Sequence, residues 1–335
     1  MLNFRHAAMA LVVLGCLLGW TTSGALAEDY DIKIATPETP PSFDNLYLQV
    51  AYEKGIFKKN GLNVTNFIQL KGGPLATTAV VSGQADVTAT DVEGIIQATK
   101  AGFPVRAVSA PSNKLSYVVA VSSDINSFAD LKGQSFAISR AGALSQYVVF
   151  PFLQRDNVSR NDIKWLSVGS SKDRLGALLA KRVKAAVLYL DNAAEVQKDQ
   201  GIHLLANIAD LMPLYPHELL LVRKDDIDNK PEKVTRIVQS IIEACRFLAQ
   251  NRDESINIFM KDTGADRALG EYTYDKLIAL KPWGLNGGMT EETLKAAMDI
   301  SVENKALDAP IPLSDFSDFR FQEEAVRRLG GPVAE

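Results

Sequence analysis

The stretch from Ser42 to Val64 constrains the fold more than any other part of this 335-residue chain. Its apolar residues Leu46, Val50 and Phe57 recur at helical spacing, so the stretch predicts one amphipathic helix with a single buried face. Gly61 follows near the end of the pattern, where a glycine can adopt the positive φ that terminates a helix. The sequence therefore indicates both where this helix ends and which face it turns toward a core.

The residues on either side of this helix are typical of β-strands. A strand-like run from Ile32 to Thr36 precedes it and another from Leu62 to Leu70 follows it. Asp44 or Asn45 can cap the first helical turn by accepting from its free N–H groups. Strand, helix and strand in this order predict a parallel βαβ crossover. Such units bind ligands at the carboxyl ends of their strands, so we expect ligand contacts between Thr36 and Phe43.

The remainder of the chain predicts an α/β protein with two lobes. Strands alternate with helices up to about Ser122, which indicates a mostly parallel sheet flanked by helices. A second alternating series opens at residues 129–133, and the chain is helical from Pro231 onward. We interpret this order as a second lobe inserted into the first, with crossings near Val121 and Leu220. The predicted division is residues 28–122 and 220–335 for lobe one and residues 123–219 for lobe two.

The N-terminal segment has the pattern of a signal peptide comprising residues 1–27. Arg5 gives it a positively charged start, residues 7–20 form an apolar core, and Ala25-Leu26-Ala27 is a cleavage site of the small-x-small type. The apolar run is short for a membrane-spanning helix. The alternative is a lipoprotein anchored through Cys16, although the residues before this cysteine form a poor lipobox. In both cases we expect export to the periplasm.

The composition argues against catalysis, metal binding and nucleic-acid binding. The chain has three histidines and two cysteines, and it has no GxSxG, HExxH, CxxC or P-loop motif. His203 and His217 lack the neighbours of a metal site, and we expect them to be structural or surface residues. Cys245 lies in an apolar helical run and is expected to be a buried thiol. A formal net charge of −4 without a basic patch argues against nucleic acid as a partner. We therefore predict no enzyme activity, no cofactor and no metal.

Three loops carry residues suited to hold a small anionic or polar molecule. The first, residues 36–43, is stiffened by prolines and presents Phe43 as a flat apolar surface. The second, residues 71–74, has paired glycines that let a ligand approach the backbone, and Pro74 suits the first turn of the following helix. The third, residues 139–145, joins a strand to a helix, where free backbone N–H groups gather. The alternative for each loop is a plain connector or turn.

Arg140 in the third loop favours an anionic ligand, because its planar guanidinium matches carboxylate, sulfonate or phosphate. The alternatives are that Arg140 points to solvent or pairs with Asp191. A weak internal sequence repeat aligns Asp91 with Asp191. This alignment predicts that the two carboxylates lie on opposite walls of one cleft. Tyr147 and Tyr189 are candidates for a ring contact, or else core residues. The candidate ligand-binding residues are Thr36, Glu38, Phe43, Gly72, Gly73, Pro74, Asp91, Ser139, Arg140, Gly142, Ala143, Ser145, Tyr147, Tyr189, Asp191 and Glu218.

Several motifs resemble those of one family of periplasmic solute-binding proteins. They are YEKGIFKKNGLNV at residues 52–64, GGP at 72–74, SGQADV at 82–87 and DLKGQSFAISRAGALS at 130–145. The family is named for the yeast thiamine-pyrimidine protein and includes sulfonate, taurine and nitrate binders. The usual member has Ser or Thr where this chain has Ala143, a departure that favours a cationic anchor over hydroxyl recognition.

The resemblance implies a two-lobed periplasmic binding protein fold of type II. It also implies a substrate-binding component of an ABC importer, with a small-molecule ligand, a membrane permease and its ATPase as partners, and we expect a monomer. The ligand would be a sulfonate, a carboxylate or a pyrimidine-like molecule. Two alternatives stay open. One is a sensory binding protein that presents its ligand to a receptor. The other is an enzyme of thiamine-pyrimidine metabolism, which the lack of a cysteine-rich segment disfavours.

Overall fold

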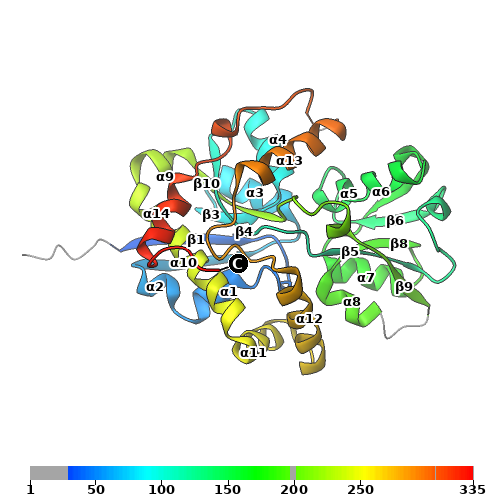
Figure 1. Ribbon diagram of the computed structural model, residues 1–335, viewed down its shortest axis with the longest axis horizontal. Coiled ribbons are helices and arrows are strands. Elements are labelled where there is room, and N and C mark those ends of the chain that lie inside the picture. The colour runs from blue at the N-terminus through cyan, green and yellow to red at the C-terminus, as the bar shows by residue number, and fades with distance from the viewer. Residues whose placement is uncertain (1–28, 197–200, 306, 335) are drawn as a thin grey trace, which may run out of the picture.

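The computed structural model describes residues 29–196, 201–305 and 307–334. The predicted signal peptide, its cleavage site and Cys16 lie outside these residues. The described chain forms two five-stranded sheets that lie side by side, each flanked by helices (Figure 1). These two sheets correspond to the two series of alternating strands and helices that the sequence predicts.

The first sheet has the strand order β2-β1-β3-β10-β4. Its strands are β1 Tyr30–Thr36, β2 Leu62–Gln69, β3 Val87–Thr90, β4 Val105–Ser112 and β10 Glu218–Arg223. β1 runs parallel to β2 and to β3, as the predicted βαβ crossover requires. β10 is antiparallel to both of its neighbours, with Leu221 opposite Thr88 on β3 and Ala107 on β4.

The second sheet has the strand order β7-β6-β8-β5-β9. Its strands are β5 Tyr117–Ser122, β6 Ser135–Ile138, β7 Lys164–Ser167, β8 Ala185–Tyr189 and β9 Ile202–Asn207. β6 is parallel to β7 and β8, whereas β5 is antiparallel to β8 and β9. Each sheet is therefore mixed rather than purely parallel. In each sheet the antiparallel strand is the first one that the chain forms after crossing from the other sheet. This strand is β5 in the second sheet and β10 in the first.

The first crossing between the sheets comes earlier than the sequence suggested. Because β5 pairs within the second sheet, the chain leaves the first sheet between Ser112 and Tyr117 rather than near Val121. It has returned by Glu218, where β10 begins. Every residue of β5 is buried, as in a central strand of either sheet, so its apolar run did not reveal which sheet it joins.

Strand β10 shows how the first sheet buries both of its faces. Successive side chains of a strand point to opposite faces. Leu220 and Val222 belong to the core beneath helices α1 and α10, whereas Leu219 and Leu221 belong to the core that contains residues of α3 and α4. The apolar run from 219 to 222 thus follows from burial on both sides, which is typical of a central strand.

The predicted helix of residues 42–64 is divided into two short helices. These are α1 Tyr47–Glu53 and α2 Ile56–Lys59. Gly55 lies between them with φ 66°, a left-handed conformation that interrupts the helix. Gly61 has φ 70° and ends the unit as predicted. The predicted apolar face is buried, although it is carried by two helices instead of one.

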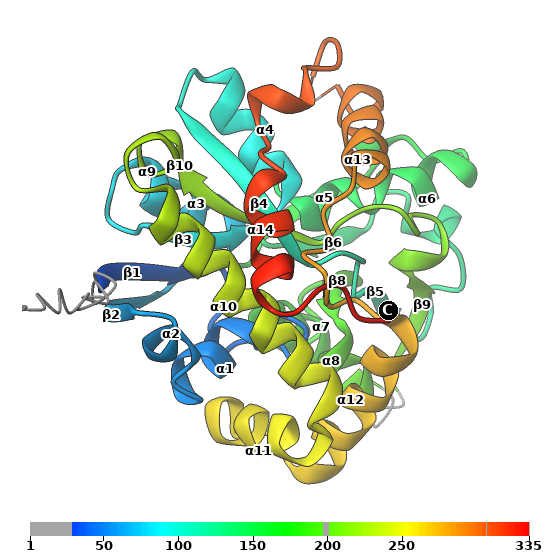
Figure 2. The same cartoon turned by 60° about the vertical axis from the view of Figure 1, so that its left-hand side comes forward.

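The other helices cover the two sheets. They are α3 Gly73–Val81, α4 Val92–Lys100, α5 Leu144–Tyr147, α6 Phe150–Arg155, α7 Ser171–Leu179, α8 Leu190–Val196, α9 Lys224–Asn229, α10 Pro231–Gln250, α11 Arg252–Thr263, α12 Arg267–Leu280, α13 Glu291–Glu303 and α14 Arg320–Arg328. The described residues also form short 3-10 turns at Ala129–Leu131, Arg160–Asp162, Ile208–Asp210 and Leu313–Asp315. Of the C-terminal helices, α10 and α14 pack on the first sheet, and Figure 2 shows these two side by side, whereas α12 contacts α8. Trp283 is buried and its indole N–H donates to the Asp44 carbonyl, so this residue packs the C-terminal part of the chain against the loop after β1.

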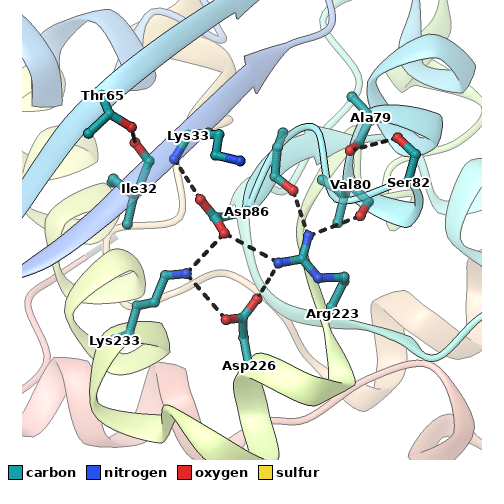
Figure 3. A network of polar contacts seen from close by, with 11 residues as sticks. Ile32, Lys33, Thr65, Ala79, Val80, Ser82, Asp86, Arg223, Asp226 and Lys233 are labelled. Atoms are coloured by element: carbon teal, nitrogen blue, oxygen red, sulfur yellow. Dashed lines mark hydrogen bonds and ion pairs between the residues drawn. The ribbon is translucent and has the colours of Figure 1, made fainter.

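A buried ionic network fastens the C-terminal half of the chain to the first sheet (Figure 3). Lys233 of α10 contacts Asp86 at 3.0 Å and Asp226 at 3.2 Å, and its side chain is 4% exposed. Arg223 at the end of β10 contacts the same two carboxylates. The Lys33 N–H also donates to Asp86. These contacts join β1, the turn before β3, β10, α9 and α10.

Candidate ligand-binding site

The loop that follows β1 meets the start of α7, the helix that follows β7, between the two sheets. Glu38, two residues beyond β1, accepts a hydrogen bond of 2.8 Å from the Ser171 N–H at the first residue of α7. Lys71 forms an ion pair of 3.2 Å with Asp173 in the same helix. Both contacts join the first sheet's loops to a helix of the second sheet. The predicted ligand-binding loop of residues 36–43 therefore lies at the junction of the two sheets.

A hollow of about 330 Å³ opens at this junction. We call it the acidic hollow. Its wall comes from the loop after β1, the starts of α7 and α8, and the α11–α12 segment, and it includes Glu38, Tyr189, Asp191 and Phe259. The carboxylates Glu195 and Asp266 line it as well, as does Lys172, which is exposed. A polar hollow with converging aromatic and charged side chains has the features of a small-molecule site.

Glu38 is a buried carboxyl at the centre of this junction. Burial raises its pKa to about 7, and this effect outweighs the opposing effects of Arg174 and the Ser171 N–H. Arg174 is itself fully buried, and its guanidinium donates to the carbonyls of Val187 and Gly169, each at 2.6 Å. Arg174 thus lies near Glu38 without forming an ion pair with it, because its hydrogen bonds go to the backbone.

Asp191 lines the same hollow and lacks a partner for one of its oxygens. The residue is 8% exposed, and its Oδ1 has no hydrogen-bond partner. Burial raises the pKa of Asp191 well above its ordinary value, and the nearby Asp44 and Glu38 carboxylates add to this effect. A buried acceptor of this kind is costly unless something donates to it.

Asp44 forms a buried ion pair with His217 that connects the first loop to the return crossing. The Oδ2–Nδ1 distance is 2.7 Å, and each side chain is 1% exposed. Ser42 and Ser116 also donate to Asp44. Burial opposes ionisation of Asp44, but His217 and the two hydroxyls hold its pKa below its ordinary value. The prediction that Asp44 or Asn45 caps the following helix is wrong, because that helix has no side-chain cap.

Glu218 follows His217 and is also buried. Burial raises its pKa to about 7, and the Tyr47 hydroxyl donates to it. The His217 ring lies 4.6 Å from the Tyr117 ring and 5.4 Å from the Tyr189 ring, and these two tyrosine rings are 4.8 Å apart. His217 is thus a structural residue, which is one of the two roles expected for it. Glu218 lies behind this aromatic cluster rather than on the wall of either hollow described here.

A second hollow, of about 470 Å³, lies between α3, α4 and the loop after β6. We call it the Arg140 hollow. Asp91 lines it and accepts a 2.7 Å hydrogen bond from the Gly94 N–H as the N-cap of α4. Glu93 also lines it, and burial followed by the Asp91 charge raises the pKa of Glu93 to about 8. Asp91 and Asp191 therefore line different hollows, and their placement on opposite walls of one cleft stays a prediction.

The third predicted loop satisfies its own polar groups. The Gly142 N–H donates to Gln146 Oε1 at 2.9 Å. The hydroxyls of Ser139 and Ser145 are 2.9 Å apart, and the Ser139 N–H donates to Ser145 Oγ. Ala143 is buried at the N-cap of α5, a helix of four residues. The backbone N–H groups that we expected to be free for a ligand are thus largely hydrogen-bonded within the loop itself.

Arg140 is exposed at the edge of the Arg140 hollow. The alternative pairing with Asp191 does not occur among the described residues, since Asp191 lines the acidic hollow. Tyr147 is half-buried and contacts Phe150 edge-on, with ring centroids 5.7 Å apart. Binding of an anionic ligand by Arg140 therefore stays a prediction.

The first two predicted loops contribute fewer ligand-facing groups than expected. Phe43 is fully buried and stacks on Phe259 at 4.6 Å, so it is a core residue and not an exposed surface. Thr36 is buried, and its hydroxyl donates to the Glu38 carbonyl. The Gly72 N–H donates to the Pro37 carbonyl. Pro74 lines the Arg140 hollow as the second residue of α3, as its suitability for a first helical turn predicted.

Gly73 is required by a close approach within the protein. A Cβ at this position would lie 2.5 Å from Asp91 Oδ2. The lack of a side chain at Gly73 therefore lets α3 pack against the Asp91 carboxylate. Ligand contact at this glycine stays a prediction.

Sequence reasoning missed Ser171, Arg174 and Tyr117 at the junction. A signal for the first existed, because Ser170 and Asp173 form a capping box that starts α7 at Ser171. Arg174 and Tyr117 carried no comparable signal, since a charged residue in a helix and a tyrosine in a strand are usually explained by exposure and by core packing.

Within the described ranges, no group of three or more His, Cys, Asp or Glu residues is arranged to hold a metal ion. In the same ranges, no helix has the length and apolar character of a membrane span. Cys245 is buried, as predicted.

Two α/β sheets joined by two crossings, with polar hollows between them, define the class of proteins with the periplasmic binding protein fold. Residues 42–255 match the profile of the NMT1/THI5 like family, and the chain belongs to this family. A Haemophilus influenzae protein provisionally named for thiamine biosynthesis is 25% identical over 223 residues, covering 65% of this chain and 69% of that protein.

Solved structures agree with the predicted fold class. The alkanesulfonate-binding protein SsuA from Xanthomonas axonopodis has a TM-score of 0.71 at 19% identity, covering 86% of this chain and 96% of that chain. The periplasmic nitrate-binding protein NrtA from Synechocystis also has a TM-score of 0.71, at 14% identity, covering 91% of this chain and 90% of that chain. These comparisons confirm the predicted family and the periplasmic binding protein fold.

Proposed function

We propose that this protein is the substrate-binding component of an ABC importer and that it captures a small polar organic molecule between its two sheets. The observation that carries this proposal is the acidic hollow, which is bounded by loops of both sheets and contains buried polar groups. Family membership and the binding proteins of the same fold support it. The absence of a catalytic motif in the sequence favours binding over chemistry.

The two crossings suit a hinge. Binding proteins close around a ligand when a few residues between two rigid bodies change their backbone angles. Here those residues lie between Ser112 and Tyr117 and between Asn207 and Glu218. The Glu38–Ser171 hydrogen bond and the Lys71–Asp173 ion pair are among the contacts that closure would make. The closed protein would then dock on a membrane permease, which works with its ATPase.

The remaining parts of this proposal concern the cellular setting. We place the exported chain in the periplasm as a monomer, after cleavage of residues 1–27. N-terminal sequencing of the exported protein tests this step, and a lipid-modified Cys16 would contradict it. Gene neighbours distinguish an importer from a sensory binding protein, since a gene for a histidine kinase beside this one would favour the sensor.

The test of binding is a thermal-shift screen of the exported chain. The compounds are sulfonates, nitrate, carboxylates, pyrimidines, flavins and organic amines. A ligand at 100 times its Kd should stabilise the fold by about 2.7 kcal/mol. Calorimetry should then give one molecule per chain, and mass spectrometry should recover that molecule unchanged. Conversion of the molecule into a product would contradict a binding function and favour an enzyme.

A further inference from the structure

We propose that the acidic hollow selects a small organic cation whose N–H groups donate to Asp191 and Glu38. This inference rests on the proposed function, because it specifies the charge of the molecule that binds between the sheets. It differs from the expectation of an anion at Arg140, and three features of the junction carry it.

The first feature is that protein carboxylates already occupy the helix starts at this junction. The N-terminus of a helix favours negative charge and offers free N–H groups. At α7 this position is taken by Glu38, which accepts from the Ser171 N–H. At α12 it is taken by Asp266, which lines the hollow and accepts from the Leu269 N–H at 2.7 Å. An anionic ligand would have to displace these carboxylates or lie beside them in a region of low dielectric.

The second feature is an excess of acceptors over donors on the wall of the acidic hollow. Asp191 is more than nine-tenths buried, and its Oδ1 has no hydrogen-bond partner. Lys172, the lysine that lines this hollow, is exposed at its mouth. The buried guanidinium of Arg174 is committed to two backbone carbonyls. The lining hydroxyls of Ser42 and Ser171 also donate within the protein, to Asp44 and Asn192. The wall therefore offers an anion the exposed Lys172 as its cation, and it presents a buried acceptor that a ligand can satisfy.

The third feature is the aromatic surface of the same hollow. Tyr189 and Phe259 line it, and the Tyr189 ring is held in place by its contact with Tyr117 at 4.8 Å. Aromatic faces attract cations through the negative potential above the ring, and this attraction grows when the pair is removed from water. Carboxylates combined with aromatic rings thus favour a flat cation with N–H groups, such as an amidinium or an aminopyridinium.

The test compares probes that share a ring and differ in charge. Benzamidinium, 4-aminopyridinium, guanidinium and small alkylammonium ions are the cations, and benzamide, benzoate and benzenesulfonate are the controls. We expect at least one cation to raise the melting temperature, whereas benzamide and the two anions do not. Asp191→Asn should then weaken binding of that cation by about tenfold to a hundredfold, as for loss of a hydrogen bond to a charged group.

Asp124→Asn is the matched control. Asp124 is an exposed carboxylate that pairs with Lys184, directly before β8, and neither residue lines the hollow, so its replacement should leave the affinity unchanged. Asp191→Ala serves as a second variant, since it removes the acceptor without adding an amide. Circular dichroism and urea unfolding confirm that each variant is folded before binding is measured.

Two results would overturn the inference in distinguishable ways. If an anion or a neutral molecule binds to Asp191→Asn as tightly as to the unaltered protein, the ligand is not a cation held by Asp191. The proposed binding function would still stand. If no cation binds, the inference of a cationic ligand is also contradicted. If, in addition, no compound of the wider screen binds, the result counts against the proposed function.

Discussion

Replacement of Glu38 by Gln should flatten the pH dependence of stability. Burial raises the pKa of this carboxyl from 4.5 to about 7, so the folded protein binds more protons than the unfolded chain between these values. The stabilising effect of the protonated form is fully present below about pH 4.5 and is lost as the pH rises through about 7. The free protein should therefore become less stable from pH 5 to pH 8.

The magnitude follows from the two pKa values. At about 1.4 kcal/mol for each pKa unit, the Glu38 contribution to the free energy of unfolding falls by roughly 2–3 kcal/mol between pH 5 and pH 8. Glu38→Gln keeps an oxygen that can accept from the Ser171 N–H and removes the titration. Urea unfolding of both proteins at the two pH values measures the difference. Glu303→Gln, at an exposed position near the end of α13, is the control.

We expect the stability of Glu38→Gln to fall less with pH than that of the unaltered protein, by the amount given above. Glu303→Gln should follow the unaltered protein. Parallel pH profiles for all three proteins would refute the assignment of this titration to Glu38. A variant that is less stable than the unaltered protein at pH 8 would show that the charged form of Glu38 is favoured, contrary to the effect of its burial.

Two further substitutions test the packing around the junction. Asp44→Asn should lower the free energy of unfolding by about 3–5 kcal/mol, because it leaves His217 buried without its partner; a loss below about 1 kcal/mol in urea unfolding would contradict this. Gly73→Ala should lower the melting temperature, because the added methyl would lie 2.5 Å from Asp91 Oδ2. Gly176→Ala is its control, since nothing lies within 4 Å of a methyl there, and it should leave the protein as stable or stabilise it by up to about 1 kcal/mol. Equal effects of the two alanines would refute the close approach.

Features set by periodic burial could be predicted from the sequence. The alternating series of strands and helices, the long α10 helix and the apolar face of residues 46–57 all follow from such patterns. The positive φ at Gly61 follows from residue type, because glycine adopts that conformation without a steric penalty. The break at Gly55 was missed because a single glycine within an apolar periodic stretch also fits a continuous helix.

Side-chain partners across the junction could not be predicted in the same way. Asp44 and His217 are separated by 173 positions, and only the fold brings them together. Asp44 has the residue type and position of a helix cap, yet a buried cation and two hydroxyls compete more strongly for its oxygens. Gly142 likewise has an N–H group suited to an anion, but Gln146 accepts from it. In both cases local chemistry left several partners open, and tertiary packing decided among them.

The most direct test of the central claim is a crystal structure of the protein with the compound that stabilises it most in the thermal-shift screen. Our account predicts one molecule enclosed between the two sheets in the acidic hollow, in contact with Glu38 from the first and Asp191 from the second. A molecule bound on the outer surface, or one that touches residues of a single sheet, would contradict it.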